Sequence, residues 1–139
     1  MATRTAAAAQ TTVQPKGLRV GLVAVTSTYT IGAGLSLSAG DVIQMIKVPA
    51  NATVVSLQVS SNYSGDAAFS VGDGLDDDRY ISRRSASVAM LPVIINRIAA
   101  PYTYSTDDTI DIDVTLVSIS TIGGSFFMTA IFSMDTGQL

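Results

Sequence analysis

The chain has 139 residues, of which 47% are hydrophobic and only 14% are charged, and its formal net charge is −3. It contains no Cys, which excludes disulfides and thiol chemistry, and no His, which removes the commonest general base and the commonest transition-metal ligand. All 11 acidic residues are Asp, and the small negative charge argues against a nucleic-acid partner. At this length a single domain is the simplest organisation, and we expect no cofactor.

The first 16 residues, MATRTAAAAQTTVQPK, are low in complexity and lack a large apolar anchor. Two interpretations fit them, a disordered leader or an extended arm that becomes ordered against a partner. Ala6–Ala9 is too short for a signal-peptide core, and no apolar run reaches the roughly 18–20 residues that span a membrane. We therefore expect cytoplasmic synthesis, no membrane partner, an arm over residues 1–16 and a folded domain over residues 17–139.

The rest of the chain is a succession of β-branched and alternating segments, separated by turns rich in Gly, Pro, Asn and Asp. The expected strands are Leu18–Thr30, Leu35–Ser38, Val42–Val48, Thr53–Ser60, Ala67–Val71, Arg79–Ser82, Ser87–Ile95, Thr109–Val117 and Ser125–Met134. About eight strands at this spacing, without a helical apolar stripe, predict an all-β fold. A β-sandwich, a jelly roll and a small barrel all fit the spacing.

Val42–Val48 is apolar on both faces, with Ile43 and Met45 opposite Val42, Ile46 and Val48. Such a strand is covered twice, either within its own domain or by a neighbouring molecule. Ser87–Ile95 has the same character. Together with the low charge, these strands predict burial in an assembly.

An acidic loop, Asp73–Arg79, is the segment that most resembles a site, with Asp73, Asp76 and Asp78 as weak candidates for a calcium ligand set. Leu75 and Arg84 break the helix-loop-helix calcium pattern. We therefore favour a solvated loop in which Arg79 pairs with an Asp, or a loop that meets a basic partner, and we predict no metal.

Two further polar pairs have ordinary explanations. Asp111 and Asp113 lie on one strand face about 6.5–7 Å apart, a spacing loosely compatible with a glycosidase pair, but we interpret them as a solvated face. We interpret Arg83 and Arg84 as a contact with another protein, since two charges are too few to favour nucleic acid. Without His, no Ser-His triad can form, and we predict that the chain is not an enzyme.

Three stretches carry a resemblance to a known family. Gly40–Ile43, Val48–Val54 and Val71–Ile81 resemble small structural proteins of tailed-phage heads, the capsid cement or decoration proteins. The resemblance implies a single jelly-roll-like β-sandwich of about eight antiparallel strands with an extended N-terminal arm. It also implies a homo-oligomer, a dimer or trimer, made in the host bacterial cytoplasm. Many copies would attach to the outside of the capsid and bridge subunits of the major capsid protein.

On this interpretation we expect the interface to involve Val42, Ile43, Met45, Arg79, Arg83 and Arg84. Two alternatives remain open. One is a neck, tail or host-recognition β-module of a virion, present in few copies. The other is a calcium-dependent ligand-binding sandwich that uses the Asp73–Asp78 loop.

Overall fold

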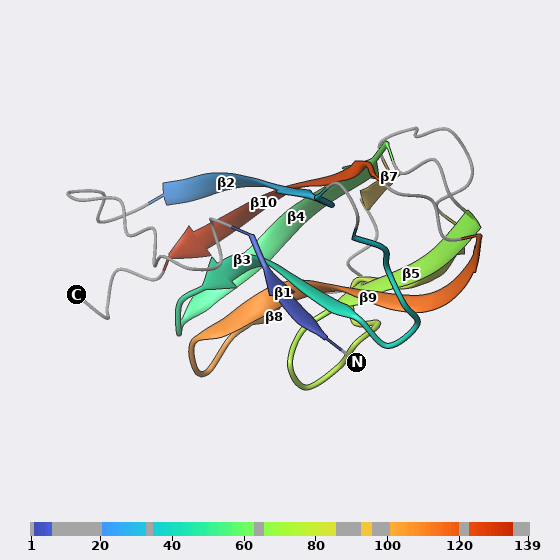
Figure 1. The fold of residues 1–139 in the computed structure, drawn as a ribbon. Coiled ribbons are helices and arrows are strands. Elements are labelled where there is room, and N and C mark those ends of the chain that lie inside the picture. Colours follow the sequence, from blue (N-terminus) through green and yellow to red (C-terminus); the bar gives the residue numbers. More distant parts are fainter. Residues whose placement is uncertain are drawn as a thin grey trace.

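The structure is an all-β sandwich, in which two sheets lie one over the other (Figure 1). The computed structural model describes residues 2–6, 21–32, 35–62, 66–85, 93–95, 101–119 and 123–134. Within these ranges the chain has no helix, and so none that is long and apolar enough to cross a membrane. The predicted fold class is confirmed.

Each sheet has five strands. Sheet A contains, in spatial order, β1 (Thr3–Thr5), β3 (Val42–Val48), β9 (Asp108–Ile119), β5 (Asp66–Gly72) and β6 (Ile81–Ser85). Sheet B contains β2 (Gly21–Thr30), β10 (Ser125–Met134), β4 (Ala52–Ser61) and β7 (Val93–Ile95), and β8 (Tyr102–Thr103) pairs with the first residues of β4. In Figure 1, sheet B is the upper layer and sheet A the lower one.

The strand predictions agree with the structure in most places. The predicted strands Val42–Val48 and Ser125–Met134 are β3 and β10 with the same bounds. Leu35–Ser38 is not a strand, and of Ser87–Ile95 only β7 falls within the described residues. The described strands pair antiparallel, as expected, except that β1 runs parallel to β3.

The core lies between the sheets and is built by period-two alternation. In β9, Ile110, Ile112 and Val114 are buried, because strand side chains point alternately to opposite faces. Sheet B supplies Phe126, Met128, Ala130 and Phe132 from β10. The rings of Phe69 and Phe126 meet edge to face across the interface with centroids 5.9 Å apart. Burial of each such large side chain contributes about 1.5–3 kcal/mol.

A β-bulge in β3 explains its apolar character and corrects our interpretation of it. The register against β9 shifts between Gln44 and Ile46, so Met45 is an extra residue and the alternation is reset there. As a result Ile43, Met45 and Ile46 are all fully buried in the core of this chain. Ile43 and Met45, which we expected at an interface, are therefore core residues of this chain, and neither side chain is exposed on its surface.

The N-terminal strand β1 is held against β3 by Asp41. The Asp41 carboxylate accepts hydrogen bonds from the amide of Ala2 (3.0 Å) and the guanidinium of Arg4 (3.1 Å). The amide of Ala6 donates to the carbonyl of Gln44 at 2.8 Å. The first residues of the expected arm thus belong to sheet A. Its remainder, and its boundary with the domain, lie outside the described residues.

Candidate functional site

The Asp73–Arg79 loop, which joins β5 to β6, folds back over the end of β5. A Cβ atom at Gly72 would lie 2.0 Å from the carbonyl oxygen of Asp76. Glycine is required there because the loop backbone passes directly against the strand. This close approach places the loop beside the outer face of sheet A, where β9 is the next strand.

Asp73 organises the loop from inside. Its carboxylate is buried and accepts the amide hydrogens of Leu75 and Asp76, each at 3.1 Å. It also accepts hydrogen bonds from the Arg79 guanidinium and, at 3.0 Å, from the Tyr104 hydroxyl. The predicted pairing of Arg79 with an Asp is confirmed. Because these four donors occupy Asp73, it is a structural residue of the loop.

Aromatic side chains fix this network to sheet B. The hydroxyls of Tyr80 and Tyr104 are hydrogen-bonded at 2.7 Å, and burial raises the pKa of both phenols well above the ordinary value. The Arg79 guanidinium lies 3.7 Å from the centroid of the Tyr102 ring, a cation–π contact. The loop is therefore anchored to β8 and to the residue that follows it.

An acidic groove of about 520 Å³ lies between this loop and sheet A. Its lining consists of Val42, Asp73, Gly74, Leu75, Asp76, Asp77, Asp111 and Asp113. Asp111 and Asp113 form the floor, since their neighbours in β9 point into the core and they pair with Gly72 and Ser70 of β5. We interpreted these two as a solvated face, whereas the structure covers them with the acidic loop.

Burial raises the pKa of both floor carboxyls, Asp111 and Asp113. Asp111 is only 5% exposed, and burial raises its pKa to about 7, with the negative charge of Asp113 acting in the same direction. Burial also raises the pKa of Asp113 to about 6, and the charge of Asp77 adds to the effect. Within the described part of the chain, the Oδ1 atom of Asp111 has no hydrogen-bond partner.

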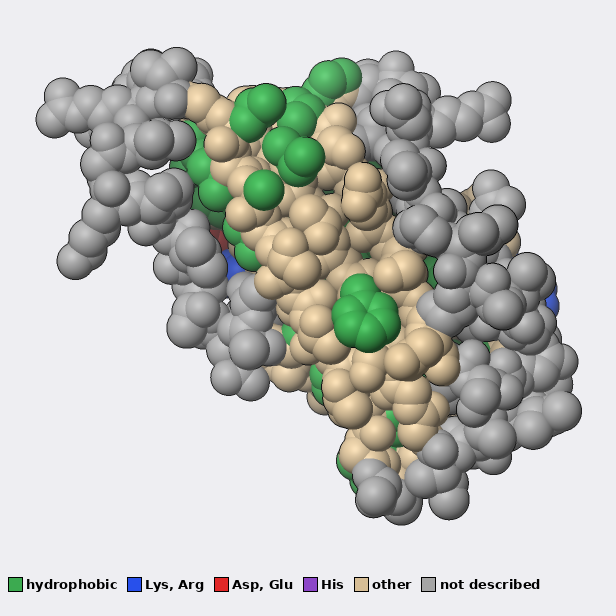
Figure 2. Space-filling model, turned by 90° about the horizontal axis from the view of Figure 1, so that it is seen from above, with side chains coloured by type: hydrophobic (Ala, Val, Ile, Leu, Met, Phe, Trp, Pro, Cys, Tyr) green, Lys and Arg blue, Asp and Glu red, His purple; other side chains and the backbone are tan. Residues whose placement is uncertain are grey.

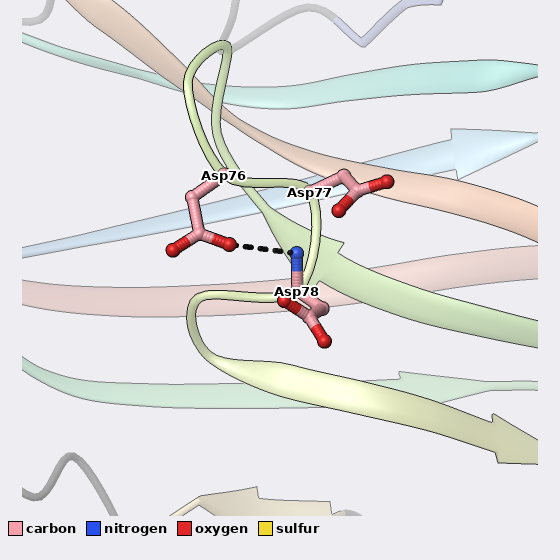
Figure 3. Close-up of side chains that lie close together, drawn as sticks. All are labelled: Asp76, Asp77 and Asp78. Atoms are coloured by element: carbon pink, nitrogen blue, oxygen red, sulfur yellow. Dashed lines mark hydrogen bonds between the residues drawn. The ribbon is translucent and has the colours of Figure 1, made fainter.

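Figure 3 shows three consecutive aspartates of the loop, Asp76 and Asp77, which form the rim of the groove, and Asp78 next to them. Each offers a carboxylate oxygen within 4.8 Å of the others. The Asp78 amide donates to Asp76 at 3.4 Å, and hydrogen bonding with Asp76 raises the pKa of the Asp78 carboxyl. Of the candidate ligands predicted from the sequence, Asp76 and Asp78 thus come together, and Asp73 is taken up by the network beneath them.

A second feature is the outer face of sheet B. The described strands of sheet B contain no charged residue, and their outward positions are mostly Ser and Thr. Leu22, Val55 and Phe127 are exposed by 64%, 40% and 38%. Figure 2 looks onto this face and shows uncharged side chains and backbone in tan, interrupted by green hydrophobic side chains, with the blue and red of charged side chains visible at its margins.

Side-chain hydroxyls of neighbouring strands form hydrogen-bonded pairs across this face. Thr26 and Thr129 are 3.0 Å apart, Thr30 and Ser125 2.9 Å, and Thr53 and Thr103 2.7 Å, measured between side-chain oxygens. Cross-strand hydroxyl pairs stabilise adjacent strands and satisfy polar groups at the surface. The alternation of β2 and β10 could have identified this face from the sequence, but it carries no motif.

The remaining predicted interface residues are dispersed. Val42 is half-buried at the wall of the acidic groove, and Arg79 is engaged by Asp73 and Tyr102. Arg83 is exposed on the edge strand β6, while the side chain of Arg84 lies outside the described residues. Val42, Arg79 and Arg83 thus lie on the groove wall, in the acidic loop and on the edge strand of sheet A.

Comparisons with known proteins place the fold. No protein-family model and no curated protein sequence matches the chain. A chain in the capsid of Ralstonia phage GP4 matches with a TM-score of 0.72 at 15% identity, over 96% of this chain and 99% of that one. A chain in the capsid asymmetric unit of cyanophage Pam1 matches with a TM-score of 0.68 at 15% identity, over 89% and 92%.

A third match is more distant. A chain in the acidic stable capsid structure of Helicobacter pylori bacteriophage KHP30 has a TM-score of 0.52 at 13% identity, over 82% of this chain and 94% of that one. At such identities the likeness concerns the fold. This chain therefore has a jelly-roll-like β-sandwich fold that also occurs among the chains of phage capsids.

Proposed function

We propose that this chain is a non-enzymatic structural protein of a phage virion, which binds the outside of the capsid and cements the shell of the major capsid protein. The observation that carries the proposal is the uncharged outer face of sheet B, with Leu22, Val55 and Phe127 exposed on it. The fold matches to chains in phage capsids, which extend over nearly the whole chain, support the virion setting.

The two outer faces of the sandwich differ in charge, as expected for a protein that attaches through one face only. The cores of protein interfaces are depleted in charged residues, because a charge loses its hydration when it is covered. Sheet B meets this condition over β2, β10 and β4. The outer face of sheet A contains the acidic groove. We therefore assign sheet B to the shell and sheet A to the solvent, with an oligomer, a dimer or trimer, as the expected attached form.

Copy number tests the role in the virion. Particles from the source culture are purified, and the chain is quantified by mass spectrometry against the most abundant shell protein. A ratio within a few-fold of one-to-one is the expected result. A much lower ratio would instead indicate a neck, tail or host-recognition module, and absence from particles would remove the virion proposal.

A pair of charge substitutions tests the assigned face. Thr28 of β2 lies opposite Phe127 on sheet B, and Thr115 lies on β9 of sheet A; both are exposed. Added to particles that lack this chain, the Thr28→Asp variant should bind at least about tenfold more weakly than the wild type, because a charge would be desolvated at the contact. The Thr115→Asp variant is the matched control and should bind normally. Equal binding by both variants would refute the assignment of sheet B.

A further inference from the structure

The acidic groove contains more negative charge than its surroundings neutralise. Arg79 pairs with Asp73 and lies 3.8 Å from Asp76, so its positive charge is already balanced by carboxylates of its own loop. Among the ion pairs of the described residues, none involves Asp77, Asp111 or Asp113. Three carboxylates thus face one groove without a cationic partner.

A second, independent observation comes from the floor. Asp111 is 95% buried, its side chain lines the groove, and its Oδ1 atom has no hydrogen-bond partner among the described residues. A buried carboxylate oxygen is costly to leave unpaired, and buried charges in proteins are ordinarily paired or coordinate metal ions. This oxygen distinguishes the groove from a cluster of surface aspartates.

We propose that the acidic groove binds one calcium ion, with carboxylate ligands from Asp111 and Asp113 on the floor and from Asp76 and Asp77 on the rim. Calcium takes six to eight oxygen ligands in flexible geometry. The groove opens to solvent, so water completes the coordination. On the rim side, the oxygens of Asp76 and Asp77 lie within 4.8 Å of each other, in a group with Asp78. Asp111 and Asp113 do not belong to that group, so a bound ion would have to draw the loop carboxylates toward β9.

The chemistry of the ligand set selects calcium over other metals. Every side-chain donor is a carboxylate, and the chain has neither His nor Cys, which zinc and the later transition metals prefer. Magnesium demands a nearly ideal octahedron. Carboxylates that come from a loop and from a separate strand fit the more adaptable calcium ion better. The bound ion would join the Asp73–Arg79 loop to Asp111 and Asp113 of β9, which lie more than 30 residues later in the sequence.

The test uses the purified full chain after treatment with EDTA and removal of the chelator. Calcium chloride is titrated calorimetrically, and thermal unfolding is followed with and without calcium. We expect one ion per chain with a Kd between about 10⁻⁵ and 10⁻³ M. A rise in Tm of about 3–8 °C is expected at calcium concentrations about a hundredfold above the Kd. Magnesium should bind more weakly.

Three variants locate the ion. Asp111→Asn and Asp77→Asn should each weaken calcium binding at least tenfold, which corresponds to about 1.4 kcal/mol. Asp107→Asn is the matched control, because Asp107 is exposed, lies outside the groove lining and holds the Ala50 amide through an oxygen that Asn retains. It should bind calcium like the wild type. Circular dichroism in EDTA establishes that each variant is folded, and Asp77 is exposed, so its replacement leaves the core intact.

Two results would overturn the proposal. One is the absence of both heat and a Tm shift at about 10 mM calcium, well above the weakest Kd expected. The other is loss of binding in Asp77→Asn with unchanged binding in Asp111→Asn, which would place the ion on the exposed Asp76–Asp78 cluster alone. The measurements need no capsid, so their outcome is independent of the proposed attachment to a shell.

Discussion

Arg79 stacks over the Tyr102 ring while its guanidinium hydrogen-bonds the buried carboxylate of Asp73. Arg79 comes from the β5–β6 loop of sheet A, and Tyr102 begins β8 of sheet B. One side chain therefore joins the acidic loop to the opposite sheet. The loop that lines the groove is thus held through Arg79 by contacts on both sides of its guanidinium.

We predict that Asp73→Ala destabilises the chain severely. The substitution removes the acceptor for Arg79, Tyr104 and two loop amides, and leaves the partly buried guanidinium with only the longer, 3.8 Å contact to Asp76. The free energy of unfolding should fall by about 3–5 kcal/mol, measured by urea denaturation. As a control, Asp107→Ala should cost about 1 kcal/mol, since its pair with Lys47 is exposed and 3.9 Å long and the hydrogen bond that it accepts from the Ala50 amide is exposed as well. Similar losses in the two variants would contradict the organising role of Asp73.

Replacement of Asp111, unlike replacement of Asp73, should stabilise the chain in the absence of divalent cations. Asp111→Asn keeps the shape of the side chain but removes a buried negative charge that faces Asp113. In EDTA at neutral to alkaline pH, we expect the free energy of unfolding to rise by about 1–3 kcal/mol. Urea denaturation of both proteins in EDTA measures the difference. A loss of stability would mean that the charge of Asp111 is already compensated within the chain.

How far the sequence predicts these features depends on whether they are local. The pairing of Arg79 with an Asp was predictable because both lie in one short loop, and the bounds of β3 and β10 followed from their apolar pattern. The bulge at Met45 was not, since an extra residue reverses the faces without any change in composition. A second register shift, between β4 and β10, leaves Val55 exposed although Leu57 and Val59 are buried.

The acidic groove shows the same limit at the level of a site. Alternation correctly placed Asp111 and Asp113 together on the face opposite Ile110 and Ile112. It could not indicate that a loop more than 30 residues earlier covers that face. This tertiary contact decides whether the two carboxylates are solvated or buried. It therefore also decides whether they are candidate ligands for a metal ion.

Gly72 provides a steric test of the loop position. We predict that Gly72→Ala lowers the free energy of unfolding by about 1–3 kcal/mol or more, because the new methyl group would overlap the backbone of Asp76 and Asp77. Gly32→Ala is the matched control. A Cβ atom there would lie 3.4 Å from a terminal carbon of Leu35, an ordinary contact with a flexible side chain. Thermal unfolding of both variants checks the contrast, and an unchanged Tm for Gly72→Ala would show that the loop does not lie against β5.

The attachment of β1 should depend on pH through Asp41. Burial opposes ionisation of this carboxyl, but hydrogen bonds from the amides of Ser38 and Ala2 and from Arg4 outweigh it and lower the pKa of Asp41 below its usual value of 3.8. A carboxyl with a lowered pKa in the folded state stabilises that state above its unfolded pKa. This stabilisation is lost as the pH falls below about 4 toward the folded pKa.

We therefore expect β1 to detach from β3 in acid before the rest of the sandwich unfolds. Hydrogen exchange of the Ala6 amide, which is bonded to Gln44, reports detachment directly. Arg4→Gln removes the ion pair and should weaken docking by about 1–2 kcal/mol at neutral pH, seen as faster exchange at Ala6 with unchanged exchange in β9. If Ala6 and β9 instead lost protection together at every pH, β1 would be part of the same cooperative unit as the core, and the ion pair would not control its docking separately.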